Sequence, residues 1–347
     1  MRRVFIHKRT VLLFLLMCIL VLAGCGAPTS GTHRPSPAFP NNPNNSPAVG
    51  PVGPVDVQPV ASEGCGKASP VELGRGTVQT VPSGSLTRSY LLYVPTGYKE
   101  TVRSPLVLNF HGHGSNALIQ AYTTNFSQLA EQQNFIVVYP QGIKGPDRRT
   151  GWDTGPANDP RVSDLLFVSD MLNFLQAKLC IDPTRIYATG FSNGGAMTDL
   201  LACKMADRIA AFAPVSGSYP PVPGGCNPAR PVPILEFHGT ADHIVPYDGS
   251  YGKNYPPIPQ WLQGWVVLDG CTTTPIITHP APGVLKEQWM GCRGDASLIH
   301  YQLTGWPHAW PRPLLLKHGK VLNAPVDATP IIWSFFKQHP LPNGKQL

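Results

Sequence analysis

The sequence predicts one large α/β domain whose mostly parallel sheet carries helices on both faces. From residue 86 onward, short runs rich in β-branched and aromatic residues alternate with longer runs of helical periodicity. This alternation favours parallel strands connected by crossover helices. About 280 residues follow Cys65 without an internal repeat or a second linker, and that length suits a single domain of this class.

The first 25 residues predict an export signal that ends in a lipid-modified cysteine. Four basic residues precede an apolar run over 11–22, which is too short for a comfortable membrane span. The run closes with Leu22-Ala23-Gly24-Cys25, which resembles the lipobox of bacterial lipoproteins. We therefore expect an exported, cell-surface protein anchored to a bacterial membrane through Cys25. An ordinary signal peptide that happens to contain a cysteine is the alternative.

Residues 26–63 predict a disordered, extended tether between this anchor and the folded domain. The segment is dominated by Pro, Asn, Gly, Ser and Val and carries almost no charge, so it cannot bury a core. The folded domain is accordingly expected to span residues 64–347.

The net charge of +7 does not indicate a nucleic-acid-binding protein. Four of the 27 basic residues lie in the signal, so the remaining chain has 23 basic against 20 acidic residues and no basic cluster. We expect no nucleic-acid partner and a monomeric protein.

Six cysteines remain after the signal, an even number that predicts three disulfides in an exported domain. Sequence proximity favours Cys203 with Cys226 and Cys271 with Cys292. These two pairs leave Cys65 for Cys180. No Cys-x-x-Cys spacing indicates a zinc site, and we expect neither a structural metal nor a cofactor.

The first half of the domain is expected to contain three strands and two helices. The strands are expected over 86–94, 105–110 and 135–139, and the helices over 125–133 and 163–179. Asp164 stands near the start of the second helix, where a carboxylate interacts favourably with the helix dipole.

The second half continues the alternation. Strands are expected over 185–189, 210–215, 233–237 and 298–303 and around Gln288, with helices over 196–206, 259–268 and 331–337. Open parallel sheets place their functional sites beyond the carboxyl ends of the strands. The candidate residues below follow such strand ends.

One short motif predicts a reactive serine. Gly190-Phe191-Ser192-Asn193-Gly194 follows an expected strand and precedes an expected helix. The Gly-x-Ser-x-Gly pattern alone is weak, but strand, tight turn and helix in that order are what a nucleophile elbow requires. We therefore expect Ser192 to be a nucleophile.

A serine nucleophile needs a base to take its proton and a carboxylate to orient that base. In this arrangement the acid follows the serine in the chain and the histidine comes last. Asp242, directly after the strand expected over 233–237, is the best acid. Asp248 and Asp269 are the alternatives.

The best candidate for the base is His308. It directly follows the strand expected over 298–303, in the segment Gly305-Trp306-Pro307-His308-Ala309. His300, inside that strand, and His318, in a basic loop, are the rival histidines.

Backbone N–H groups are expected to stabilise the oxyanion that forms during ester hydrolysis. One donor is the amide of Asn193, next to the nucleophile. The second is expected from the glycine-rich segment His111-Gly112-His113-Gly114, which follows an early strand. We favour the His113 amide over that of Gly112; the alternative is that this segment is only a turn.

Several ordered motifs together resemble the secreted polyhydroxybutyrate depolymerase and feruloyl esterase group of α/β-hydrolases. They are Leu108-Asn109-Phe110-His111-Gly112, Gly190-Phe191-Ser192-Asn193-Gly194-Gly195-Ala196-Met197, His238-Gly239-Thr240-Ala241-Asp242 and Pro307-His308-Ala309-Trp310-Pro311. The resemblance implies an α/β-hydrolase fold and a serine esterase with Ser192, Asp242 and His308 as nucleophile, acid and base. One departure is Trp306-Pro307 before the histidine, where the family typically has glycines.

The substrate is expected to be an ester, either of a polyester or of a hydroxycinnamate or acetyl group in plant cell walls. Trp152, Trp306 and Trp310 are expected to line an aromatic cleft for it, although buried packing explains loop tryptophans equally well. An acetyl xylan esterase or another polyester hydrolase is the alternative within this class.

Two hypotheses from other classes are weaker. A metal-dependent hydrolase would use His111 and His113 at a strand end, with His238 and Asp242 as further ligands, but would leave the serine motif unexplained. A non-catalytic surface-binding lipoprotein would have the same anchor and tether, but would not need the three catalytic residue types in order.

Overall fold

The computed structural model describes residues 62–154, 163–249, 255–294, 296–315 and 321–342. All of them belong to one compact unit, Pro54–Leu347. The expected lipid-bearing Cys25, the tether up to residue 61 and the rival base His318 lie outside the described residues, as does the whole of the other unit, Met1–Gly53.

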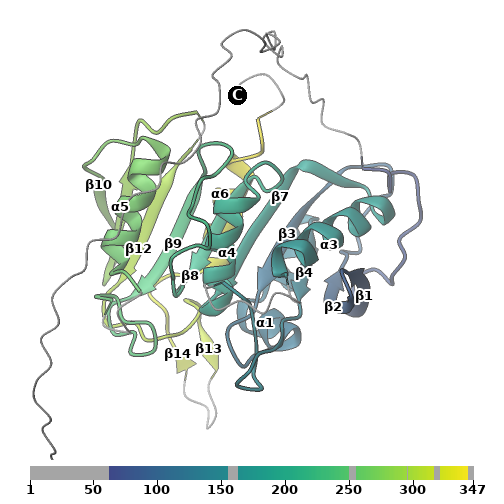
Figure 1. Cartoon of the computed structure of the whole chain (residues 1–347), viewed down its shortest axis with the longest axis horizontal. Coiled ribbons are helices and arrows are strands. Elements are labelled where there is room, and N and C mark those ends of the chain that lie inside the picture. Colours follow the sequence, from purple (N-terminus) through teal and green to yellow (C-terminus); the bar gives the residue numbers. More distant parts are fainter. Residues whose placement is uncertain (1–61, 155–162, 250–254, 295, 316–320, 343–347) are drawn as a thin grey trace, which may run out of the picture. The chain divides into compact units, whose positions relative to one another are not determined.

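A ten-stranded sheet forms the centre of the domain (Figure 1). Six central strands run parallel, and an antiparallel pair extends the sheet at each edge. In spatial order the strands are β1 (Thr77–Ser83), β2 (Leu86–Tyr93), β4 (Ile136–Pro140), β3 (Ser104–Phe110), β7 (Ile181–Phe191), β8 (Ala211–Val215), β9 (Ile234–Gly239), β12 (Leu298–Leu303), β11 (Val284–Trp289) and β10 (Ile276–Ala281).

Helices cover both faces of this sheet, as the sequence predicts. Helices α3 (Asp164–Lys178), α4 (Asn193–Lys204) and α5 (Ile258–Asp269) lie in front of the sheet in Figure 1, and α6 (Ala328–Gln338) lies behind it. Side chains of one strand pack against the helices on both faces of the sheet, because alternate residues point to opposite faces. Leu106 and Leu108 join the core with α3, α4 and α5, whereas Val107 joins the core with α6 and with α2 (Phe126–Gln133).

The expected elements all occur, with boundaries displaced by a few residues, and the α/β prediction is confirmed. The helix expected over 125–133 is preceded by a second one, α1 (Ala117–Thr124), because Asn125 adopts a left-handed conformation that separates the two. The edge strands β1 and β10 were not predicted. Every residue of β10 is exposed or half-buried, so this strand lacks a buried apolar face that alternates with a polar one.

Two short antiparallel pairs complete the secondary structure, β5 (Ile143–Lys144) with β6 (Thr150–Gly151) and β13 (Leu314–Leu315) with β14 (Val321–Leu322). None of the helices in the described ranges is long and apolar enough to cross a membrane.

The three expected disulfides are confirmed. They join Cys65 to Cys180, Cys203 to Cys226 and Cys271 to Cys292. The first ties the start of the described domain to the residue that precedes β7. The second ties the end of α4 to the segment that follows β8.

Candidate active site

Ser192 stands at a sharp turn between β7 and α4. Its backbone adopts φ 58° and ψ −119°, a region that non-glycine residues occupy only under constraint. The constraint comes from its neighbours, because the Ser192 amide donates to the Val215 carbonyl at 2.9 Å. A Cβ on Gly194 would lie 2.1 Å from the Phe110 carbonyl oxygen, so only glycine fits there. This is the geometry of a nucleophile elbow.

Asp242 and His308 meet beyond the ends of β9 and β12. His308 Nδ1 donates to Asp242 Oδ2 over 2.7 Å, and the other carboxylate oxygen accepts the amides of Ile244 and Val245. These bonds fix the tautomer of His308, since a carboxylate accepts and Nδ1 must therefore carry the proton. In the neutral ring, Nε2 then carries the lone pair that a general base requires.

The same contacts decide the electrostatic state of Asp242. Burial alone raises its pKa, but the hydrogen bond and charge of His308, the Val245 amide and the charge of His238 outweigh burial and hold the pKa below its usual value. Asp242 is therefore a carboxylate at neutral pH.

The His308 ring lies beside the elbow. Its centroid is 4.7 Å from the ring centroid of Phe191, the residue that precedes Ser192. The described contacts include no hydrogen bond between the Ser192 hydroxyl and His308. Catalytic hydrogen bonds are often long before substrate binds.

The expected oxyanion donors lie close to the elbow. Asn193 is the first residue of α4, where backbone N–H groups have no partner within the helix. A Cβ on Gly112 would lie 3.2 Å from the Ser192 Cβ, so the glycine-rich loop passes directly against the nucleophile. The Gly114 and Ser115 amides are bonded to the carbonyls of Thr150 and Gly112. Within the described part of the chain, the Gly112 and His113 amides have no such bond.

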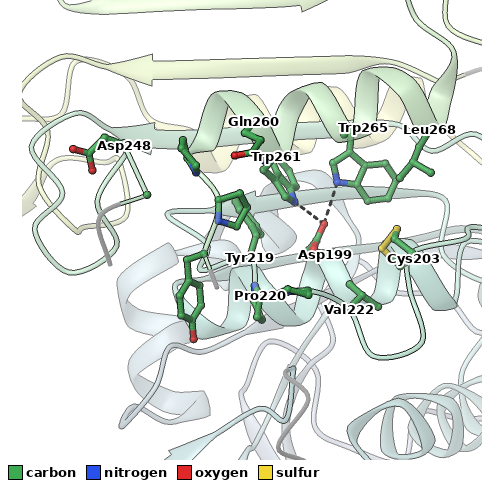
Figure 2. Close-up of a pocket in the computed structure, with 17 residues that line it drawn as sticks. Asp199, Cys203, Tyr219, Pro220, Val222, Asp248, Gln260, Trp261, Trp265 and Leu268 are labelled. Atoms are coloured by element: carbon green, nitrogen blue, oxygen red, sulfur yellow. Dashed lines mark hydrogen bonds between the residues drawn. A yellow bond between two sulfur atoms is a disulfide. The ribbon is translucent and has the colours of Figure 1, made fainter. Parts of the chain in front are cut away.

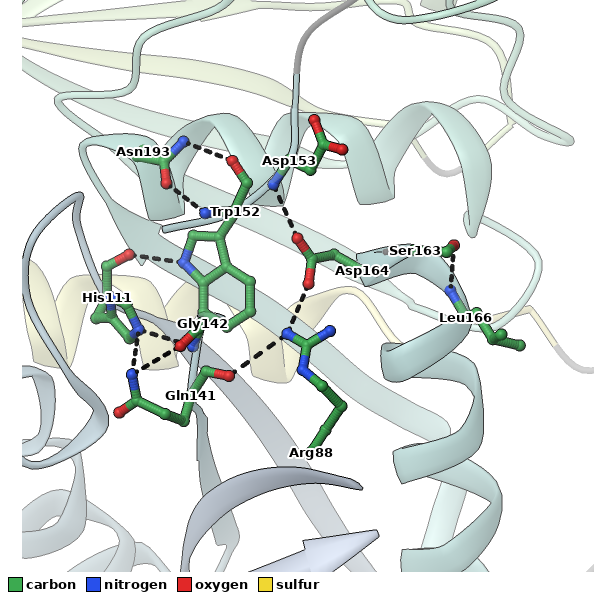
Figure 3. Close-up of polar contacts among 10 residues, drawn as sticks. All are labelled: Arg88, His111, Gln141, Gly142, Trp152, Asp153, Ser163, Asp164, Leu166 and Asn193. Carbon is green, nitrogen blue, oxygen red and sulfur yellow. Dashed lines mark hydrogen bonds and ion pairs between the residues drawn. The ribbon is translucent and has the colours of Figure 1, made fainter. Parts of the chain in front are cut away.

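Figure 3 shows how the elbow and this loop are held together through Trp152. The Asn193 side chain accepts from the Trp152 amide at 2.7 Å and donates to the Trp152 carbonyl at 3.2 Å. The Trp152 indole N–H in turn donates to the His111 carbonyl at 2.8 Å. The Asn193 side chain thus links the elbow to Trp152, a contact that the sequence did not predict.

A buried ion pair supports Trp152 from behind. Arg88 donates to Asp164 Oδ1 over 2.7 Å, and both side chains are almost inaccessible to solvent. Asp164 Oδ2 accepts the amide of Asp153, the residue after Trp152. The helix-dipole role predicted for Asp164 is therefore accompanied by a tertiary role that a single helix could not reveal.

The histidines of the metal hypothesis are engaged elsewhere. His111 is fully buried, with Nε2 accepting the Gly142 amide and Nδ1 donating to the Gly112 carbonyl. Burial lowers the pKa of His111, which agrees with a neutral ring. The exposed His113 side chain contacts Asp147 instead. No group of three metal-ligating side chains comes together among the described residues.

A second charged cluster, which the sequence did not predict, lies behind Asp242. Glu236 and His238 of β9 and His300 of β12 are all fully buried. Glu236 contacts His238 Nδ1 over 3.0 Å and His300 Nδ1 over 2.6 Å. The rival base His300 is therefore tied to Glu236. Of the alternative acids, Asp269 is buried against the Val232 amide and Asp248 lines the cavity described below.

The three tryptophans do not form an open aromatic cleft. Trp310 is fully buried and Trp152 and Trp306 are 5% exposed. Each indole N–H is bonded internally: Trp152 to the His111 carbonyl, Trp306 to the Ala309 carbonyl and Trp310 to the Thr329 hydroxyl. The structure corresponds to the packing alternative for these residues, because their rings fill the core.

A cavity of about 670 Å³ lies between α4, α5 and the segments that follow β8 and β9 (Figure 2). At its wall the buried Asp199 accepts the indole N–H groups of Trp261 and Trp265, each at 3.1 Å. Burial raises the pKa of Asp199 to about 7. None of Ser192, Asp242 and His308 lines this cavity.

The chain is similar to known ester hydrolases. A family model described as esterase PHB depolymerase matches residues 88–221. Feruloyl esterase D of Neurospora crassa is 30% identical over 252 residues, which cover 70% of this chain and 76% of that relative. Feruloyl esterase B of Piromyces equi is 32% identical over 232 residues, which cover 64% of this chain. The chain spans 42% of the length of feruloyl esterase B.

A solved structure shows the same fold. The acetyl xylan esterase from Aspergillus awamori superposes with a TM-score of 0.54 at 18% identity, covering 76% of this chain and 100% of that one.

Proposed function

Because the chain belongs to the polyhydroxybutyrate depolymerase and feruloyl esterase group of α/β-hydrolases, we propose that it is a serine esterase acting through Ser192, His308 and Asp242. The observation that carries this proposal is the Asp242–His308 hydrogen bond of 2.7 Å beside a serine in the elbow conformation. No other described serine combines a strained strand-to-helix turn with an adjacent, carboxylate-oriented histidine.

The proposed reaction has two halves. His308 Nε2 takes the Ser192 proton as the oxygen attacks the ester carbonyl, and His308 then gives that proton to the leaving alcohol. A water molecule, activated by the same nitrogen, releases the acid from the acyl-enzyme. Asp242 keeps the ring in the required tautomer and stabilises its cation.

The oxyanion of each tetrahedral intermediate is assigned to backbone amides. The Asn193 amide is the first donor and the His113 amide the second, with Gly112 as its alternative. The internal bonds of Gly114 and Ser115 support this choice, because they remove those two amides from the candidates.

The proposed substrates are feruloyl or acetyl esters of plant cell walls, or polyesters. The first two substrate classes are supported by similar proteins, because one relative is a feruloyl esterase and one structural neighbour is an acetyl xylan esterase. The buried tryptophans supply no aromatic platform at the site, so recognition must come from other surfaces near the elbow.

We also propose that the protein is exported and held at a bacterial membrane through lipid on Cys25. Three disulfides are consistent with export, because such bonds persist in oxidising compartments. The lipobox-like sequence and the polar tether support the anchor.

A fluorophosphonate probe tests the nucleophile. Wild-type protein should be labelled and Ser192→Ala should not, whereas Ser216→Ala, which changes another serine of positive φ, should be labelled like wild type. Equal labelling of wild type and Ser192→Ala would reject the proposal. Turnover of p-nitrophenyl acetate, methyl ferulate, acetylated xylan and amorphous polyhydroxybutyrate then separates the substrates.

A further inference from the structure

Both ring nitrogens of His238 face hydrogen-bond acceptors. Nδ1 lies 3.0 Å from Glu236 Oε1 and Nε2 lies 2.9 Å from the Val245 carbonyl oxygen. A carbonyl oxygen and a carboxylate can only accept, so each nitrogen must carry a hydrogen. A neutral imidazole has only one. The ring is fully buried, so solvent does not replace either of these partners.

Glu236 is held in the ionised form that this assignment needs. Its carboxylate receives contacts from three potential donors, Tyr219 OH at 3.1 Å and the Nδ1 atoms of His238 and His300. The register between the strands explains the arrangement, because His300 of β12 stands directly opposite Glu236 of β9. Although burial raises its pKa, the hydrogen bonds and charges of the two histidines bring the pKa of Glu236 down to about 2.

His238 also reaches the proposed catalytic acid. Its Nε2 lies 3.5 Å from Asp242 Oδ2, the oxygen that accepts the proton of His308 Nδ1. A charged His238 therefore places a cation directly behind the carboxylate that orients the base. Such a cation keeps Asp242 ionised and limits how strongly the Asp242–His308 pair holds an extra proton.

We propose that His238 is a buried imidazolium, held by Glu236 and the Val245 carbonyl, that positions Asp242 and sets the pH at which the Asp242–His308 pair becomes protonated. The effect on activity rests on the proposed esterase function. The charge of His238 does not, because it follows from the contacts of the ring. His238 is a positioning residue, because it acts through Asp242 and does not contact the elbow.

The groups around His238 are consistent with a stable charge. Those that face it or its partner are Glu236 on its own strand, His300 on β12, Tyr219 after β8, and Asp242 and Tyr247 after β9. Burial by itself lowers the pKa of His238, but the hydrogen bond and charge of Glu236 outweigh burial and raise it.

Nitrogen-15 NMR of the imidazole rings tests the charge directly, with the unmodified protein. At pH 7.5 both nitrogens of His238 should have the chemical shifts of an imidazolium, with Glu236→Gln used for assignment. A neutral tautomer of His238 at that pH would overturn the proposal. This experiment requires no turnover, so failure of the esterase assignment and failure of the charge assignment give different results.

The pH dependence of kcat/KM tests the positioning role. In His238→Gln, a positive charge is lost 3.5 Å from the Asp242 oxygen that accepts from His308. This loss should move the acidic limb to higher pH, by about one unit. His300→Gln is the matched control, because His300 is equally buried and bound to Glu236 but has no contact with Asp242.

The control should lose stability without moving the acidic limb. Equal shifts in both variants, or none in His238→Gln, would overturn the positioning role. If His238→Gln does not fold, His238→Asn replaces it, and the NMR result on the unmodified protein still decides whether the cation exists.

Discussion

Two buried polar networks flank the elbow, and they differ in the groups that they position beside it. On one side, Glu236, His238 and Asp242 lead to the ring of His308. On the other, Arg88, Asp164 and Trp152 lead to the backbone of the glycine-rich loop. In the proposed mechanism, the first network ends on the side chain that gains and loses a proton. The second ends on the His111 carbonyl, in the loop that carries the candidate oxyanion amides.

This difference separates two ways in which burial serves a site. Charge in the His308 network controls protonation, so neutralising one of its members should change how activity depends on pH. The Trp152 network has no contact with Asp242 or His308 among the described residues and holds the loop in position, so its disruption should lower kcat at every pH. The predictions below test this separation, beginning with the largest effect.

The largest effect is expected for Asp242→Asn. An asparagine offers His308 Nδ1 either an acceptor or a donor, so the ring is no longer fixed in the tautomer that leaves Nε2 free. We expect kcat to fall by about 10⁴-fold at pH 7 with the fold retained, as measured by ester turnover and circular dichroism. Asp248→Asn serves as the matched control, because Asp248 follows the same strand but lines the separate cavity. A comparable loss in the control would reject Asp242 as the acid.

Among changes to the Trp152 network, Arg88→Met should lower the free energy of unfolding most. It leaves the Asp164 carboxylate buried without its cation, which we expect to cost about 3–5 kcal/mol in the free energy of unfolding. Chemical denaturation measures this loss. Arg88→Met combined with Asp164→Leu removes both charges and should recover most of the stability. The acidic limb of the activity profile should stay in place in the single variant, and a shift would contradict the separation of the two networks.

Asn193→Ala should have a smaller and purely positional effect. The variant keeps the Asn193 backbone amide but loses both side-chain bonds to Trp152. We expect kcat to fall by up to about 30-fold with little change in pH dependence, because the two lost hydrogen bonds together contribute about 2 kcal/mol. Trp152→Phe, which removes the indole bond to His111, should act on the same loop. If the decreases in kcat of the two single variants multiply in the double variant, the two contacts act independently and do not hold the same loop conformation.

The two networks also differ in how much the sequence could reveal. Ser192, Asp242 and His308 each follow a predicted strand in the expected order, so chain position was enough to propose them. The partners behind them depend on strand register and chain crossings. Glu236 meets His300 only because β9 and β12 pair in one particular register, and Arg88 lies 76 residues from Asp164.

The tryptophans show a second limit of the sequence. Trp306 and Trp310 lie on either side of His308 in the sequence. At these positions an indole ring could either contact the substrate or pack in the core. Composition does not distinguish the two, since the exposure of an indole ring depends on the helices packed over it. Trp310 is covered by α2 and α6, through Phe126 and Thr329.

The smallest effect on activity is expected for another buried carboxylate, Asp199, which belongs to neither network. Its pKa is about 7 in the folded protein against 3.8 for the ordinary group. Between these two values the unfolded chain has lost the proton that the folded chain still holds, so the free energy of unfolding falls as pH rises through this window. Asp199→Asn cannot ionise, yet its amide oxygen can still accept both indole N–H groups.

The difference in stability between Asp199→Asn and wild type isolates this group from all others that titrate. It should grow between pH 4 and pH 7, level off above that, and favour the variant at pH 8 by on the order of 2–4 kcal/mol. Turnover should be unaffected, because neither Ser192, Asp242 nor His308 lines the cavity of Asp199. A difference that does not change with pH would mean that Asp199 is already ionised in the folded state and that its two indole donors are enough to hold a buried charge, as Glu236 is held by its histidines.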